Sequence, residues 1–308
     1  MAGSIQIRMG GYGPPSTGFS RALKAIGDRL TTEFGSEVAV DYVWNIMDRG
    51  HKAEDILPLV EGGALTLGYQ SSSYLTDRIP ALGMIDLPFL FSDRETAREA
   101  MDEELGAFLT RCIEERMNFR VLGWFENGFR HLSNRRHAVR KPADLAGMRI
   151  RVLPSEVHAK TFKLLGAEPQ RCDLSEALAA IQTGSIDAQE NPLANTVTYG
   201  VHKLHRFHTM TGHFYVSRPI FVNRTAFDSW PQKLQDAMRD AVTQAVALQR
   251  DFAIEEEAAA RAEIEKDGGE IVGLTLLEHA AFAAAVMPLL DDADNVYGRD
   301  VMKLARGK

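Results

Sequence analysis

The sequence contains few of the residues that mark specialised classes of protein. Only two of its 308 residues are cysteine, Cys112 and Cys172, so at most one disulfide bond can form and no metal-type cysteine spacing exists. Its 25 glycines and 12 prolines are too few for a fibrous or low-complexity chain. The net charge is −7, with no run of five like charges. We therefore expect no nucleic-acid partner, because such binding needs clustered Lys and Arg.

Long hydrophobic segments are also missing. The longest candidate, residues 280–290, is rich in alanine and interrupted by Pro288, whereas a bilayer-spanning helix needs about 20 apolar residues. The first four residues lack the basic and apolar regions of a signal peptide. Composition alone does not decide between a cytoplasmic protein and the mature form of an exported protein.

The first half of the sequence alternates between strand and helix periodicity. Such a rhythm predicts an α/β fold with a parallel sheet and helices on its faces. Phe19, Leu23, Ile26 and Leu30 recur at helical spacing, and Ser16 or Thr17 is placed to cap that helix. The predicted elements are strands at 5–9, 38–44, 65–69 and 120–125, helices at 17–34, 53–60 and 94–116, and a loop at 71–91.

The second half repeats this alternation and then contains one long helical segment. The predicted elements are strands at 148–152 and 186–190, helices at 155–165 and 174–183, and an extended stretch at 207–222 broken by Gly212 and Pro219. Residues 231–267 contain no Gly or Pro after the first position and predict a helix about 55 Å long. Because its apolar positions keep no strict heptad, we expect it to join two lobes rather than form a coiled coil. No linker is evident, which indicates several chain crossings between the lobes.

Arginine and asparagine side chains are placed where an α/β sheet binds ligands. Arg149 and Arg151 share one face of a predicted strand, and Arg151 lies at its carboxyl end, where open sheets collect ligands. A guanidinium there matches a carboxylate with two parallel hydrogen bonds. Asn191 ends another strand, and Arg130 begins a further strand after a glycine. These residues suggest a carboxylate site.

Two other patterns favour ordinary structure over chemistry. Residues 13–20 resemble a phosphate loop, but Phe19 stands where that motif needs Lys, so nucleotide binding is not expected. His202, His205 and His208 repeat every third residue, with His213 beyond. Zinc sites favour i, i+4 pairs or cysteine partners, so we interpret these as a solvated face or ordinary histidines and expect no metal. Nucleophile-elbow and zinc-protease motifs are absent.

A set of ordered motifs carries a family resemblance over nearly the whole chain. Its central parts are DLAGMRIRV at 144–152, LGAEP at 165–169, EAL at 176–178 and IQTGSIDAQENP at 181–192, preceded by DLPFLF at 86–91 and GFR at 128–130. Together they resemble the DctP-type solute-binding proteins of tripartite ATP-independent periplasmic (TRAP) transporters. The resemblance implies a two-lobed, type II-like periplasmic-binding-protein fold with a long helix spanning both lobes. By that analogy lobe I comprises residues 1–126 plus 214–250, and lobe II residues 127–213 plus 251–308.

The resemblance also implies which residues bind the ligand. An organic acid would lie in the interlobe cleft, its carboxylate clamped by Arg151 with help from Asn191 and Arg130. The first strand–helix turn and the loop after the third strand would supply further contacts, from Tyr12, Ser16, Tyr69, Gln70, Ser71 and Ser72, with His213 and Phe214 among the pocket walls. Some metal-dependent members carry a tryptophan after the Gln-Glu pair, where this chain has Asn191. We therefore expect no cofactor.

The resemblance favours a receptor that performs no chemistry. It implies a periplasmic protein with its signal peptide removed, monomeric, which delivers an organic acid to the TRAP membrane permease subunits. The sequence does not decide between an aromatic or aliphatic carboxylate and a hydroxylated sugar acid. Two alternatives stay open, namely a two-lobed sensor of an organic acid, and a small-acid enzyme that uses His213 or Asp187.

Overall fold

The computed structural model describes residues 3–306, which divide into two compact units. Unit 1 contains the described residues up to Ser71 together with Thr110–Glu126 and Ser217–Ile254, and unit 2 contains Ser72–Leu109, Asn127–Val216 and the chain from Glu255 on. The sequence-based division placed residues 72–109 in the first lobe, whereas here they belong to unit 2. The reason is that the 3-10 helix η5 (Pro80–Asp86) packs against three helices of that unit, α5 (Glu156–Leu164), α11 (Ala293–Tyr297) and α12 (Arg299–Arg306).

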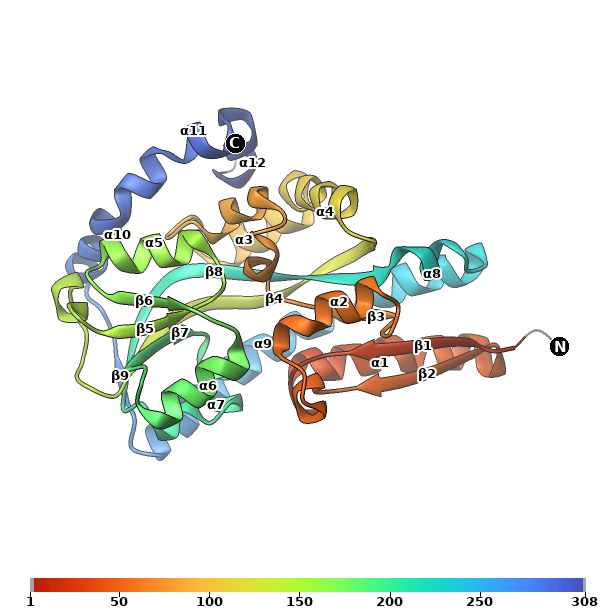
Figure 1. The fold of residues 1–308 in the computed structure, drawn as a ribbon, viewed down its shortest axis with the longest axis horizontal. Helices are drawn as coiled ribbons and strands as arrows, with labels where there is room; N and C mark the ends of the chain where they lie inside the picture. The colour runs from red at the N-terminus through yellow and green to blue at the C-terminus, as the bar shows by residue number, and fades with distance from the viewer. Residues whose placement is uncertain (1–2, 307–308) are drawn as a thin grey trace. The chain divides into compact units, whose positions relative to one another are not determined.

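Unit 1 is built on three parallel strands and the end of a fourth, antiparallel one (Figure 1). Helix α1 packs against β2 and buries Phe19, Leu23, Ile26 and Leu30, as their spacing predicts. The Thr17 hydroxyl accepts a hydrogen bond from the Ser20 amide at 3.3 Å and caps α1. The elements of unit 1 are β1 (Ile5–Gly10), α1 (Gly18–Phe34), β2 (Val38–Val43), α2 (Ile56–Glu61), β3 (Leu67–Tyr69) and α8 (Arg224–Asp228).

Unit 2 contains the strand order β4-β7-β5-β6, in which β7 is antiparallel to β4 and parallel to β5. Asp173 caps α6 and Gly184 ends it in the left-handed conformation (φ 78°), so this helix has the bounds predicted from the sequence. The elements of unit 2 are α3 (Arg94–Asp102), β5 (Arg149–Val152), α5 (Glu156–Leu164), β6 (Glu168–Arg171), α6 (Leu174–Thr183), β7 (Ala188–Asn191), α7 (Leu193–Thr198), β9 (Glu270–Val272), α10 (Leu276–Asp291), α11 (Ala293–Tyr297) and α12 (Arg299–Arg306).

Three long elements continue from one unit into the other: β4 (Phe119–Asn134), β8 (Phe207–Asn223) and α9 (Gln232–Lys266). The expectations of several chain crossings and of one long helix are thus confirmed. The predicted breaks in the two strands are wrong. Gly128 (φ 84°) and Gly212 (φ 56°) adopt left-handed backbone angles without ending their strands, because glycine has no Cβ to clash there.

Further differences from the sequence-based prediction are local. The single helix expected at 94–116 is two helices, α3 and α4 (Glu104–Arg116), separated at Glu103, which leaves helical geometry with ψ −139°. Strand β6 was not predicted because it contains Pro169, which an edge strand tolerates. The expected loop at 71–91 contains two 3-10 helices, η4 (Ser72–Leu75) and η5.

Neither a membrane-spanning helix nor a disulfide bond is found in the described part of the chain. Among residues 3–306, no helix has both the length and the apolar character that a membrane crossing requires. Cys112 and Cys172 are free thiols, one in each unit, so no disulfide joins them.

Candidate functional site

Arg151 is a cation buried at the centre of the sheet of unit 2. It lies on β5, paired with Gln170 of β6 on one side and Gln189 of β7 on the other, and is only 1% exposed. Its Nε and Nη2 donate hydrogen bonds to the Cys172 carbonyl at 3.2 and 3.0 Å, and Nη2 donates to the Tyr74 hydroxyl at 3.2 Å. One edge of the guanidinium is therefore held by neutral acceptors.

The charge of Arg151 is not balanced by a carboxylate in direct contact. Burial opposes the charged form, but the fields of Tyr74, Glu190 and neighbouring groups outweigh it and raise the pKa of Arg151, which keeps it cationic. Within the described part of the chain, no carboxylate lies within ion-pair distance of it and Nη1 has no hydrogen-bond partner. A guanidinium has five N–H donors, so two of them point from Nη1 with no protein acceptor. A buried cation of this kind is stabilised by an anion that enters beside it.

Arg130, by contrast, has its charge neutralised by Glu190. The antiparallel register of β4 and β7, with His131 opposite Asn191, brings the two side chains together, and they are 1% and 0% exposed. Arg130 Nε contacts Glu190 Oε2, and Nη2 donates to Oε1 at 3.1 Å and to the Glu190 carbonyl at 2.6 Å. Burial raises the pKa of Glu190, but Arg130 and the nearby His213 and His158 outweigh that effect and lower it. The ligand role that the resemblance gives Arg130 stays a prediction.

Around Glu190 lies a buried polar cluster that sequence reasoning missed. The His158 ring lies with Nε2 3.4 Å from Asp86 and Nδ1 3.8 Å from Glu190, and it stacks on Phe214 at a centroid distance of 3.9 Å. Ser73 donates a hydrogen bond of 2.7 Å to Asp86. Asp86 and Glu190 lie in the DLPFLF and IQTGSIDAQENP motifs that carry the family resemblance, whereas nothing local in the sequence indicated His158.

Asn191 ends β7 next to this cluster in the chain. Its side chain is 4% exposed, donates to the Gln189 amide oxygen at 3.4 Å and accepts from the Asn195 amide at 3.3 Å. Asn195 also donates to Asn127 at 3.3 Å. Side-chain amides thus cluster at the carboxyl end of β7, where Asn191 precedes Pro192 and keeps an extended backbone.

In unit 1, the predicted contact residues surround a buried arginine. The rings of Tyr12 and Tyr69 are 5.3 Å apart, and Phe19 stacks on Tyr69 at 5.2 Å. The Arg218 Cζ lies 5.1 Å from the Tyr12 ring, 4.1 Å from Phe19 and 5.7 Å from Tyr69. Arg218 is 3% exposed and was not predicted. Its signal in the sequence was a charged residue between the apolar runs FYV and PIFV of the expected extended stretch.

The loop after β3 contains both structural and unpaired polar groups. Gln70 holds the loop by donating to the Ala53 carbonyl at 2.7 Å and accepting from the Ser71 amide at 2.8 Å. The buried hydroxyls of Ser71 and Ser72 have no hydrogen-bond partner among residues 3–306. Ser16, in the first strand–helix turn, is exposed.

The structure places the predicted site residues in two groups. Unit 2 contains Ser72, Arg130, Arg151, Asn191, His213 and Phe214, and unit 1 contains Tyr12, Ser16, Tyr69, Gln70 and Ser71. Phe214 is part of the hydrophobic core of unit 2.

The histidines are not a solvated face. His202, His205, His208 and His213 are all buried, and His205 and His208 are 0% exposed. Burial is the main cause that lowers the pKa of His205 to about 3 and that of His208 to about 4. These two imidazoles are therefore neutral at physiological pH.

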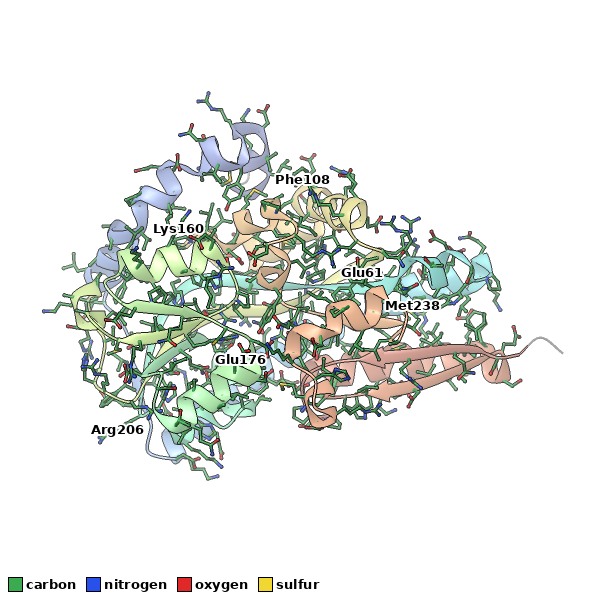
Figure 2. The ribbon with its side chains drawn as sticks, in the orientation of Figure 1. Glu61, Phe108, Lys160, Glu176, Arg206 and Met238 are labelled. Carbon is green, nitrogen blue, oxygen red and sulfur yellow. The ribbon has the colours of Figure 1, made fainter. Side chains whose placement is uncertain are left out.

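One cavity of unit 2 lies apart from the predicted site. It has a volume of about 370 Å³, and its lining includes Phe108 and Lys160, both labelled in Figure 2, together with Tyr297. None of the predicted site residues lines it.

Comparison with known proteins identifies relatives over most of the chain. The family model for bacterial extracellular solute-binding protein, family 7 (DctP), matches residues 50–295. A solute-binding protein of Verminephrobacter eiseniae is 31% identical over 247 residues, which are 80% of this chain and 73% of that protein. The 2,3-diketo-L-gulonate-binding periplasmic protein YiaO of Escherichia coli is 28% identical over 254 residues, 82% of this chain and 76% of that protein.

Solved structures show the same fold. A TRAP periplasmic solute-binding protein of Sulfitobacter sp. NAS-14.1 with bound β-D-galacturonate has a TM-score of 0.91 at 22% identity, covering 98% of this chain and 99% of that one. One of Sulfurospirillum deleyianum with bound succinate has a TM-score of 0.92 at 24% identity, covering 100% and 99%. The two-lobed α/β fold with a long helix, expected from the sequence, is confirmed.

Proposed function

Because the chain belongs to the DctP family of bacterial extracellular solute-binding proteins, we propose that it is a periplasmic receptor that binds a small organic acid and delivers it to the permease subunits of a TRAP transporter. In this proposal the protein acts as a monomer and the ligand leaves chemically unchanged. The related proteins with bound galacturonate and succinate support an acid as the class of ligand.

The single observation that carries the proposal is the buried guanidinium of Arg151. Its Nε–Nη2 edge is fixed by the Cys172 carbonyl and Tyr74, so Nη1 is held in a defined direction before any ligand arrives. A carboxylate that accepts an Nη1 hydrogen forms a charge-assisted hydrogen bond, which contributes about 1.5–3 kcal/mol. Such prior positioning raises affinity because little side-chain entropy is lost on binding.

The two residues that an enzyme would use are engaged in structural contacts, which supports a receptor. His213 has Nδ1 2.6 Å from the Thr211 hydroxyl and Nε2 3.7 Å from Glu190, with its ring 2% exposed. Asp187 accepts two hydrogen bonds of 2.9 Å from Arg149. Asp187 is thus held in an ion pair, and His213 is held beside Glu190 in the buried interior of unit 2.

A ligand screen tests the proposal. The protein is unfolded, dialysed and refolded to remove bound ligand, and its Tm is then measured against succinate, galacturonate, a 2-oxo acid, an aromatic acid and neutral galactose. We expect at least one acid to raise Tm in proportion to its excess over Kd, and galactose to have no effect. Stabilisation by galactose and by none of the acids would contradict the proposal. Turnover of the stabilising acid, followed by mass spectrometry, would favour an enzyme instead.

A further inference from the structure

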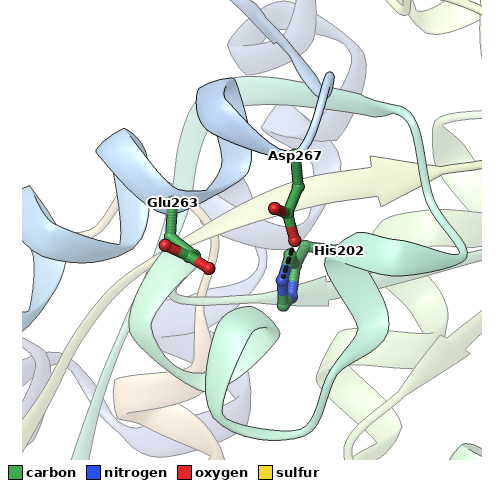
Figure 3. A group of neighbouring side chains, drawn as sticks. All are labelled: His202, Glu263 and Asp267. Carbon is green, nitrogen blue, oxygen red and sulfur yellow. Dashed lines mark ion pairs between the residues drawn. The ribbon is translucent and has the colours of Figure 1, made fainter.

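Three potential metal ligands from distant parts of the chain meet in unit 2. His202 lies on the short 3-10 helix η7 (Val201–Lys203), and Glu263 and Asp267 lie at the end of α9. Figure 3 shows both carboxylates extending from the end of α9 towards the His202 ring. One ligand atom from each residue lies within 4.8 Å of the other two.

The burial of His202 is the first feature that needs an explanation. The residue is 7% exposed, and neither of its ring nitrogens has a hydrogen-bond partner among the described residues. Its Nε2 lies 3.2 Å from Asp267 Oδ2, a charge contact whose geometry is not that of a hydrogen bond. Buried polar groups are normally satisfied, so an imidazole in this state indicates a missing partner.

The surroundings favour a cation as that partner. Glu263 and Asp267 are four residues apart, which places them on one side of the last turn of α9 and just beyond it. The carboxyl end of a helix also carries partial negative charge and favours a nearby cation. Among residues 3–306, the only lysine or arginine in contact with either carboxylate is Lys266, which donates to Glu263 at 3.2 Å and has a side chain 73% exposed.

We propose that His202, Glu263 and Asp267 form a binding site for one zinc-like divalent cation. Zn²⁺ accepts one imidazole nitrogen and two carboxylate oxygens, and a water molecule completes four-coordination. A hard cation such as Mg²⁺ or Ca²⁺ prefers an all-oxygen set with more ligands, so the imidazole selects against it.

Metal binding requires only small movements of exposed groups. In a tetrahedral site with bonds of about 2.0–2.1 Å, ligand atoms lie about 3.3–3.4 Å apart. The pair at His202 and Asp267 already has this separation, at 3.2 Å. Glu263, whose side chain is 40% exposed, has to move closer by a change of rotamer. The bound cation would tie η7 to the end of α9 and stabilise unit 2.

The test measures zinc binding by the full chain without an affinity tag, after treatment with EDTA and without any organic acid. Calorimetry and thermal unfolding are followed with ZnCl₂ and with MgCl₂ in a non-coordinating buffer. We expect one zinc ion per chain with a Kd in the micromolar range or below, a raised Tm, and no response to magnesium.

Matched variants locate the site. Glu263→Gln combined with Asp267→Asn removes both carboxylate ligands from partly exposed positions and should weaken zinc binding at least tenfold, as should His202→Gln. His137→Gln, at an exposed histidine, should bind zinc like the parent. Zinc affinity that is unchanged in the double variant, or the absence of stoichiometric binding by the parent chain, overturns the proposal. Neither result bears on the organic-acid site, because no ligand atom is shared.

Discussion

Replacing Arg151 with methionine separates the binding role of the guanidinium from its structural role. Methionine is apolar and similarly extended, so it fills the space on β5 but removes the charge and all five donors. If a ligand carboxylate accepts an Nη1 hydrogen, the loss is about 1.5–3 kcal/mol of binding free energy. At about 1.4 kcal/mol per factor of ten, Kd should rise by about 10–10²-fold.

The same substitution should change the stability of the ligand-free protein much less. It removes the three hydrogen bonds to the Cys172 carbonyl and the Tyr74 hydroxyl, at about 1 kcal/mol each. It also removes a buried cation that has no carboxylate in direct contact, which offsets that loss. We expect the free energy of unfolding to change by about 2 kcal/mol or less.

Calorimetry with the acid found in the screen, and urea unfolding of ligand-free protein, measure the two effects separately. Arg151→Lys serves as the second variant, because it keeps the charge but lacks the planar fork, and it should raise Kd at least tenfold. A folded Arg151→Met protein whose Kd lies within threefold of the parent value would refute the assignment of Nη1 as the carboxylate donor.

Three further predictions concern buried side chains that carry or can gain a charge. Glu190→Gln should lower the free energy of unfolding by about 3–5 kcal/mol, because it leaves the buried guanidinium of Arg130 without its counter-ion. The control Asp187→Asn, whose partner Arg149 is half-exposed, should lower it by about 1 kcal/mol or less, and urea melts compare the two variants. Acid should destabilise the protein, because burial lowers the pKa of His131 to about 3 while the unfolded imidazole protonates near 6.5. Each such histidine lowers the free energy of unfolding by about 1.4 kcal/mol per pH unit as the pH falls below about 6.5. In urea melts, His131→Gln should therefore make the free energy of unfolding less dependent on pH between about pH 6.5 and 5. Arg218→Met, which removes a buried cation from three aromatic rings, should cost about 2 kcal/mol in the same melts, against about 0.5–1 kcal/mol for Arg21→Met at an exposed cation–π contact.

Local periodicity predicted the helices well because their signals lie within a few turns. The cap at Thr17, the bounds of α6 and the uninterrupted composition of α9 are all short-range features, and the structure agrees with each. The long strands were predicted less well. Glycine usually marks a break, but Gly128 and Gly212 adopt left-handed backbone angles inside strands that continue past them.

The position of Arg151 at the carboxyl end of a buried strand could be inferred from the order of residues, because alternation and strand direction are local properties. The pairing of Arg130 with Glu190, which lies 60 residues away, could not be inferred from the sequence, because it depends on the register between β4 and β7. The meeting of His202 with Asp267 likewise required η7 and the end of α9 to pack in one unit. The amino-acid order thus determined which groups carry charge and which helices form, while long-range packing decided which charges are paired, since pairing energy depends on distances that only the folded chain sets.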